Sequence, residues 1–229
     1  MSVFAIADLH LSFGADKPMD VFPGWRSYTD RIYANWQHLV APEDTVVIAG
    51  DISWAMDLKD TQKDFAFLQS LPGHKLLMKG NHDYWWTTKA KMDRFLQEQG
   101  FSSLSFLHNN YVLADGVALC GSRGWFYDAK TDADKKVLLR EVGRLRMSIE
   151  PALKDGYDPV VFLHYPPVYN GVECPEIMDV LREYRIRKCF YGHVHGGNAA
   201  KRAFVGEKDG IVFRLIACDY IGFTPLSIW

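Results

Sequence analysis

The sequence lacks the features that would place a chain in a membrane or hold it together with disulfides. Its four cysteines have no CxxC spacing, which disfavours a disulfide scaffold and a cysteine-type zinc site. No apolar run approaches the ~20 residues of a membrane span, and no basic segment precedes the first run as in a secretory signal. The net charge of −2 gives no sequence-wide basic field, so nucleic acid is disfavoured as a partner. We expect a cytoplasmic protein with no membrane partner.

What the chain has instead is a set of short apolar runs that end in polar residues. With 229 residues and 48% hydrophobic content it can bury a full core, and we expect one domain over residues 1–229. Five runs have the character of buried strands, at residues 2–7, 45–49, 75–78, 159–163 and 188–191. The residues that follow them are Asp8 and His10, Asp51, Asn81 with His82 and Asp83, His164, and His193 with His195. Because ligands gather at the carboxyl ends of strands in an α/β sheet, these side chains are expected to share one crevice.

Between the runs, the spacing of apolar residues predicts helices and hairpins. Helices are predicted over residues 28–39, 57–71, 87–99 and 132–154. Two groups of antiparallel strands are predicted at 104–107, 111–114 and 117–120, and at 202–205 and 211–217. The alternation predicts an α/β fold with βαβ units, and the hairpins predict a second sheet stacked on the first with helices outside.

The polar residues at the strand ends have the chemistry of metal ligands. Asp8 with His10, and His193 with His195, are two residues apart in extended chain, so each pair can face one place. Carboxylate, carboxamide and imidazole without thiolate suit Mn, Fe or Zn. Seven ligands are too many for one ion and natural for two divalent metal ions that share a carboxylate.

These blocks, in this order, resemble the five motifs of the calcineurin-like metallophosphoesterases. The resemblance implies a four-layer α/β/β/α sandwich of two mixed sheets flanked by helices. It also implies a phosphohydrolase in which two cations activate a bridging hydroxide for in-line attack, with His82 as a catalytic residue that is not a ligand and Asp83 orienting its ring. One metal would be held by Asp8, His10, Asp51 and His195, and the other by Asp51, Asn81, His164 and His193.

Departures from the relatives narrow the substrate. The Asp-Arg-Gly of protein phosphatases is absent, and Trp54 stands where purple acid phosphatases have a tyrosine ligand. The sequence is more similar to the bacterial-type phosphohydrolases and phosphodiesterases, so we expect a small phosphorylated substrate such as a nucleotide or another diester. A nuclease of the same superfamily and a non-catalytic metal-binding scaffold are the alternatives. The sequence leaves the oligomeric state open.

Several other residues have two interpretations of similar weight. Trp54 and Trp85, with their neighbours Tyr84 and Trp86, either line the mouth of the site and bind substrate or belong to the core. Arg123 either holds a phosphate or lies on the surface. Residues 11–24 are expected to form a wall of the site. The basic residues of the predicted helix 132–154 are interpreted as a solvated face, and His38, His74 and His108 as ordinary histidines.

Overall fold

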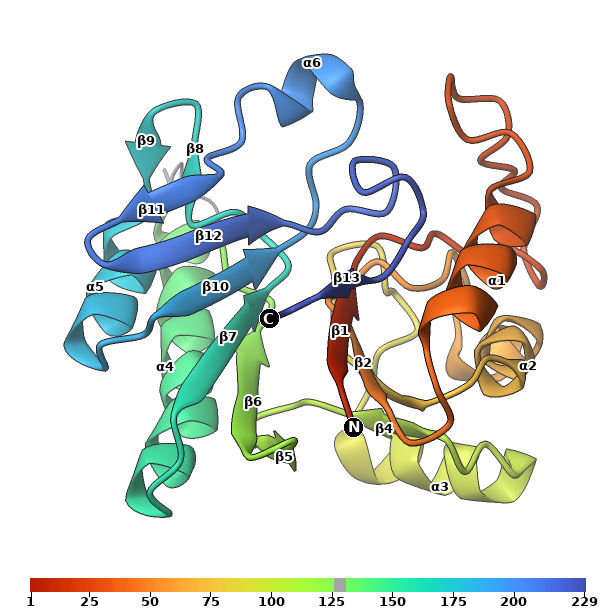
Figure 1. The fold of residues 1–229 in the computed structure, drawn as a ribbon, viewed down its shortest axis with the longest axis horizontal. Helices are drawn as coiled ribbons and strands as arrows, with labels where there is room; N and C mark the ends of the chain where they lie inside the picture. Colours follow the sequence, from red (N-terminus) through yellow and green to blue (C-terminus); the bar gives the residue numbers. More distant parts are fainter. Residues whose placement is uncertain (126–130) are drawn as a thin grey trace.

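The computed structural model describes residues 1–125 and 131–229 and consists of two sheets with helices on their outer faces (Figure 1). Residues 126–130, part of the 123–157 segment whose role the sequence leaves open, lie outside the described residues. The expected fold class is confirmed: two large mixed sheets lie between two groups of helices.

The first sheet contains the strands that end in the N-terminal motifs. Its order is β13-β1-β2-β3-β4, parallel except for β13. The strands are β1 (Val3–Ile6), β2 (Thr45–Ile48), β3 (His74–Leu77), β4 (Leu104–Phe106) and β13 (Leu226–Ser227). Because β1, β2 and β3 are neighbours and parallel, the residues that follow them emerge at the same edge.

The second sheet contains the strands that end in the C-terminal motifs. Its order is β11-β12-β10-β7-β6-β5, with both edge strands antiparallel to their neighbours. The strands are β5 (Val112–Ala114), β6 (Val117–Ser122), β7 (Pro159–Leu163), β10 (Lys188–Tyr191), β11 (Gly206–Lys208) and β12 (Ile211–Leu215). A separate small hairpin pairs β8 (Val168–Tyr169) with β9 (Val172–Glu173).

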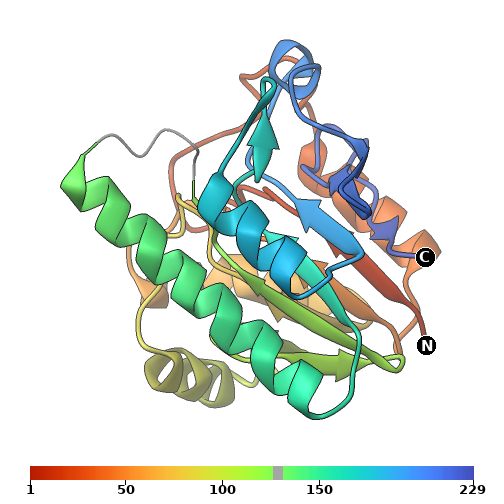
Figure 2. The same cartoon turned by 90° about the vertical axis from the view of Figure 1, so that its left-hand side faces the viewer.

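Helices cover the outer face of each sheet. The helices beside the first sheet are α1 (Tyr28–Leu39), α2 (Gln62–Ser70) and α3 (Lys89–Gln99). Those beside the second are α4 (Asp132–Lys154) and α5 (Pro175–Glu183), which face the viewer in Figure 2. Two short helices, η1 (Leu58–Thr61) and α6 (Gly197–Ala200), lie in connections.

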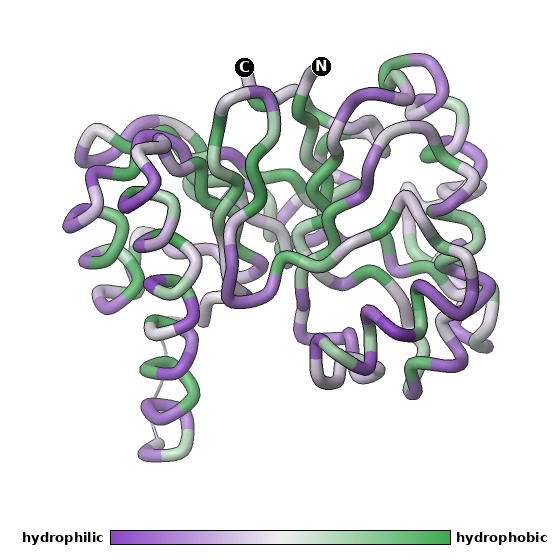
Figure 3. Tube along the Cα trace, turned by 90° about the horizontal axis from the view of Figure 1, so that it is seen from below, coloured by the Kyte–Doolittle hydropathy of each residue, from purple (hydrophilic) through white to green (hydrophobic). Residues whose placement is uncertain are grey.

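Strand alternation explains the layers. In β1, Ala5 points to the layer between the sheets while Ile6 points to the helices, and in β7 the same holds for Phe162 and Val161. The two inner faces therefore share one buried layer, and hydrophobic strands run through the middle of the molecule in Figure 3. Small residues in this layer, such as Ala5 and Ala49, let the sheets approach closely.

The long helix α4 confirms the predicted boundaries and has a clear physical start. Thr131 caps it in a reciprocal capping box with Asp134, and Leu138, Leu145 and Ile149 are buried against the second sheet. Despite its length, this helix carries charges on every turn. No helix in the described ranges 1–125 and 131–229 combines the length and apolar character needed to span a membrane.

Three predicted elements are wrong in detail. The strand predicted at 104–107 as part of an antiparallel group is β4, which pairs parallel with β3 in the first sheet. The strand predicted at 202–205 lies instead at 206–208, as β11. The turn before β12 contains only Asp209 and Gly210, both with positive φ, so the strand that pairs with β12 must end directly beside this turn. The predicted helix 57–71 is divided into η1 and the shorter α2.

Candidate metal centre

Two clusters of ligand atoms lie at the carboxyl edges of the two sheets. One contains Asp8, His10 and His195, and the other contains Asp51, His164 and His193. Within each cluster, one ligand atom from every residue lies within 4.8 Å of the others. Each cluster combines residues that follow strands of the first sheet with residues that follow strands of the second. The sheets together, and neither one alone, build the site.

Asp51 connects the two clusters. One oxygen of its carboxylate, Oδ2, lies 3.8 Å from Nε2 of His10 and 3.5 Å from Nε2 of His164. The side chain is 2% exposed, so water does not screen these contacts. A single carboxylate oxygen is thus within reach of ring nitrogens from both clusters, as a bridging ligand requires.

The carboxamide of Asn81 completes the second cluster. Its Oδ1 lies 2.7 Å from Nε2 of His164 and 2.9 Å from Nδ1 of His193. On the other side of its ring, His164 directs Nδ1 at the carbonyl of Ala49, 3.1 Å away. A proton on Nδ1 leaves the Nε2 lone pair free for a metal, which is the usual way in which proteins fix the tautomer of a histidine ligand.

The first cluster is electrostatically incomplete without a cation. The Nε2 atoms of His10 and His195 face each other at 3.1 Å, with Asp8 Oδ1 3.3 Å from His195 Nε2. Burial disfavours the charged His195 ring, but the carboxylates of Asp8 and Asp219 outweigh it and raise the pKa to about 10. Burial lowers the pKa of His10 to about 4, against the pull of Asp51 and Asp8. A divalent cation fits this donor set and would displace the proton on His195.

The backbone is strained at several of these positions. Asp8, His10, Asp51 and His193 all have φ between 46° and 71°, in the left-handed region that non-glycine residues seldom adopt. Glycines relieve crowding nearby: a Cβ on Gly80 would lie 2.1 Å from Oδ1 of Asp51. Residues held in such conformations cluster at functional sites, where surrounding contacts impose them.

A family model corroborates this geometry. The model for calcineurin-like phosphoesterases matches residues 1–197, which include every residue of both clusters. The chain belongs to this family. Because the calcineurin-like phosphoesterases use divalent metals and the chain contains two candidate metal-binding clusters, it is a metal-dependent phosphoesterase.

Solved structures share the phosphoesterase fold at low sequence identity. A protein of unknown function from Aquifex aeolicus is 19% identical, with a TM-score of 0.52, 99% of this chain covered and 95% of that one. The phosphopantetheinyl hydrolase from Mycobacterium tuberculosis is 15% identical, with a TM-score of 0.55; the match covers 93% of this chain and 87% of that one. A protein from Thermus thermophilus is 12% identical, with a TM-score of 0.56; the match covers 84% of this chain and 81% of that one. No curated protein matches this chain.

His82 lies beside the clusters without joining them. Its ring centroid is 5.7 Å from that of His10 and 4.5 Å from that of Trp54, and its backbone N–H donates to Asp51 Oδ1 at 2.8 Å. Burial lowers its pKa, against the effect of the Asp51 carboxylate. A histidine that is close to the metal ligands without being one of them can move a proton.

The predicted role of Asp83 in orienting the His82 ring is wrong. The Asp83 carboxylate is fully buried and accepts backbone N–H groups from Gly80 (2.7 Å), Asp51 (2.9 Å) and Ile52 (2.9 Å). Burial and the charge of Asp51 raise its pKa to about 7. Asp83 therefore ties the loop after β3 to the loop after β2, and acts as a positioning residue for Asp51.

An aromatic cavity opens beside the first cluster. It has a volume of about 460 Å³, and its walls include His10, His82 and His195 together with Met19, Phe22, Trp25 and Trp54. The expectation that residues 11–24 form a wall of the site is therefore confirmed. Trp54 stacks on His10 at 4.8 Å, with Lys17 4.9 Å from its ring centroid.

The structure separates the other predicted substrate residues from this cavity. Trp85 is 2% exposed and packs on Phe65, with its Nε1 donating to Asp83, so it belongs to the core. Arg123 lies on the opposite side, where its backbone oxygen accepts the N–H of His164 at 3.1 Å and its guanidinium pairs with Glu141.

One contributor to the site was missed by sequence reasoning. Asp219 places Oδ1 3.1 Å from Nδ1 of His195 and accepts the backbone N–H of Gly196 at 2.8 Å. The signal was present, because Asp219 follows the end of an apolar run just as Asp8 does. A carboxylate behind a histidine ligand orients the ring and increases its basicity.

Proposed function

We propose that this chain is a binuclear phosphodiesterase that hydrolyses a small phosphorylated molecule. The observation that carries the proposal is the position of Asp51, whose Oδ2 lies within 4 Å of ring nitrogens from both clusters. A carboxylate in that position would be shared by two cations, so that they would occupy one site rather than two independent ones.

The ligands divide in the way the family resemblance implies. Asp8, His10 and His195 with Asp51 would hold one cation, and Asn81, His164 and His193 with Asp51 the other. Mn, Fe and Zn all accept this mixture of oxygen and imidazole donors. Two such ions, when bound, supply an activated water near neutral pH and neutralise charge on the phosphoryl oxygens.

The protein's own residues provide the rest of the chemistry. His82 stands at the border between the metal ligands and the aromatic cavity, where it can stabilise the phosphoryl group and protonate the leaving oxygen. Tyr84 Oη lies 3.4 Å from His82 Nδ1 and biases the orientation of the ring. Since the ligands and His82 are all present, a non-catalytic scaffold is disfavoured.

The aromatic cavity supports a small substrate with an apolar or aromatic leaving group. Trp25, Trp54 and Phe22 offer ring faces to a base or another flat group, and the cavity has the size of a small-molecule site. One structural neighbour is named a phosphopantetheinyl hydrolase, which is compatible with a small phosphorylated substrate.

The test compares diester and monoester hydrolysis in the metal-loaded protein. With Mn²⁺ added, we expect bis-p-nitrophenyl phosphate to be cleaved faster than p-nitrophenyl phosphate. Asp51→Asn should abolish both activities and reduce the content of both metals, while the exposed Asp60→Asn serves as the matched control. Hydrolysis of neither ester by the wild type would favour a scaffold, and a preference for the monoester would refute the diesterase.

A further inference from the structure

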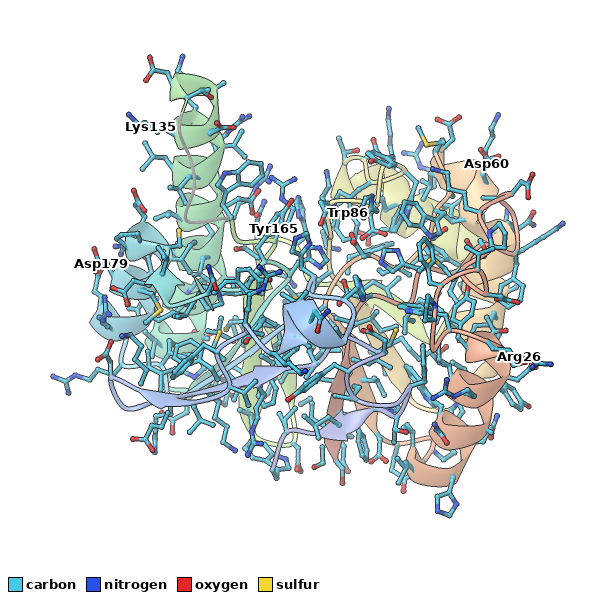
Figure 4. All side chains as sticks on the ribbon, turned by 90° about the horizontal axis from the view of Figure 1, so that it is seen from above. Arg26, Asp60, Trp86, Lys135, Tyr165 and Asp179 are labelled. Carbon is cyan, nitrogen blue, oxygen red and sulfur yellow. The ribbon has the colours of Figure 1, made fainter. Side chains whose placement is uncertain are left out.

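A second cavity lies on the other side of the metal centre from the aromatic one. We call it the basic cavity; it is small, and its charged or polar walls include Lys79, His108, Asn109, Arg123, Glu141 and Arg144. It lies between the loops after β3 and β4 and the helix α4. Figure 4 looks onto this edge, with Trp86 on one side and α4 on the other.

The floor of the basic cavity is a buried carboxylate. Glu141 is 1% exposed, and its Oε1 accepts from Arg144 Nη1 at 2.6 Å and from Arg123 Nη2 at 3.3 Å. Its Oε2 has no hydrogen-bond partner among the described residues. Glu141 therefore holds two guanidinium groups in fixed places and leaves their remaining N–H groups for other acceptors.

The walls carry more positive charge than Glu141 balances. Lys79, Arg123 and Arg144 supply three cationic groups against one carboxylate. Within residues 1–125 and 131–229, Lys79 makes no side-chain hydrogen bond or ion pair, and the buried Nε of Arg123 has no acceptor. Grouping partly buried cations in this way is unfavourable unless an anion joins them. Arg144, interpreted from the sequence as part of a solvated helix face, is partly exposed, and it also lines this cavity and pairs with Glu141.

The basic cavity is directly connected to the metal ligands. Lys79 precedes Asn81 by two residues, and the carbonyl of Arg123 accepts the backbone N–H groups of His164 (3.1 Å) and Tyr165 (2.9 Å). The ring of Trp86 lies 5.8 Å from that of His108. The loop after β3 thus carries both the ligand Asn81 and a wall of the basic cavity, Lys79.

We propose that the basic cavity binds a second phosphate of the substrate. This inference rests on the proposed function, because it assumes that the first phosphate is held at the metal centre. Two guanidinium groups held by Glu141, together with the ammonium group of Lys79, match the charge and the acceptors of a phosphate dianion. The substrate class becomes a phosphoester with a further phosphoryl group on one side and an apolar or aromatic group on the other.

A binding experiment on the metal-loaded, full-length chain tests the basic cavity. Calorimetry would compare propyl phosphate with alkanediol bisphosphates of increasing chain length. We expect the best bisphosphate to bind about tenfold or more tightly than propyl phosphate, because a second site adds to the first. Lys79→Met and Arg144→Met should bring this ratio close to one. The matched control is Arg140→Met, because Arg140 lies on the same helix outside the cavity and should keep the wild-type ratio.

The outcomes distinguish this proposal from the one on which it rests. Lys79→Met removes no ion pair among the described residues, so it tests the proposal even if Arg144→Met fails to fold. Equal binding of mono- and bisphosphates by the wild type, or an unchanged ratio in a folded Lys79→Met variant, would overturn the second phosphate site. Failure of the phosphodiesterase itself would appear separately, as no turnover of bis-p-nitrophenyl phosphate by the wild type.

Discussion

At the scale of single residues, the site combines strained backbone with buried carboxylates that accept backbone hydrogen bonds. Asp8 and Asp51 hold left-handed conformations, yet their oxygens accept the backbone N–H groups of His193 and His82. Asp83 accepts four more backbone N–H groups from the same loops. These hydrogen bonds fix ligand positions before a cation arrives, so the folded chain is pre-organised for metal.

Replacing His82 should separate metal binding from turnover. We expect His82→Ala to keep both ions, because His82 is in neither ligand cluster, and to lose roughly 10²–10⁴-fold in kcat through loss of proton transfer. Elemental analysis and steady-state kinetics on the same sample provide the two readouts. The exposed His38→Ala is the control, and wild-type kcat in metal-loaded His82→Ala would exclude the role.

Replacing Asp219 should weaken one ion selectively. Asp219→Asn removes the charge behind His195 Nδ1 but preserves the size of the side chain. We expect the affinity for the cation in the cluster of Asp8, His10 and His195 to fall about 10–100-fold, while the other cation is unaffected. Competition with a fluorescent chelator measures both affinities. Equal affinities in the variant and the wild type would show that Asp219 does not support His195.

At the scale of elements, strand ends were easier to predict than loops. The runs before Asp8, Asp51 and His164 were predictable because buried parallel strands are continuously apolar and stop at a polar residue. The loop after β3 could not be predicted in this way, because its buried and exposed residues do not alternate with a regular spacing. Tyr84, for example, is 53% exposed whereas its neighbour Trp85 is 2% exposed. Hydrogen-bond partners inside such loops, as for Asp83, depend on tertiary contacts that the sequence does not display.

Short elements also escaped prediction. The hairpin of β8 and β9 and the edge strand β13 contain two residues per strand, too few for any alternation to be visible. The basic cavity is a tertiary feature in the same sense. Arg144 and Lys79 are 65 positions apart, and only the packing of α4 beside the loop after β3 brings them together.

The strand β3 contains a buried lysine that should make stability depend on pH. Lys75 is fully buried, with Nζ donating to the carbonyls of Leu71 (2.6 Å) and Gly73 (2.7 Å), and burial lowers its pKa from 10.5 to about 8. Between these values the unfolded chain binds more protons than the folded one, so the contribution of Lys75 to stability rises with pH. The rise is at most about 3 kcal/mol.

Urea unfolding of wild type and Lys75→Met checks this effect. Between pH 8 and pH 10.5 the free energy of unfolding of the wild type should rise relative to that of the variant. Below pH 8 the difference between the two free energies should be constant. Other groups titrate in the same range, but their contributions to the free energy of unfolding are the same in both proteins and cancel in the difference. The exposed Lys63→Met should follow the wild type, and a pH-independent difference for Lys75→Met would contradict a depressed pKa.

At the scale of the whole molecule, the metal centre links the two sheets. Asp8, His10, Asp51 and Asn81 follow strands of the first sheet, whereas His164, His193 and His195 follow strands of the second. Each cluster draws on both sheets, so a bound cation adds a connection across the buried layer between them. Metal binding and global stability should therefore be coupled.

Removing the metals should lower the thermal midpoint of the whole chain. A ligand that binds only the folded state at a hundredfold excess over its Kd stabilises by about 2.7 kcal/mol, and each kcal/mol raises the midpoint of a chain of this size by roughly 2–4 °C. We expect calorimetric midpoints about 5–10 °C lower per ion after chelation, with recovery on adding Mn²⁺. Asp51→Asn should show little of this shift, since it loses the carboxylate that both clusters share. A wild-type midpoint that does not change on chelation would mean that the ions do not hold the two sheets together.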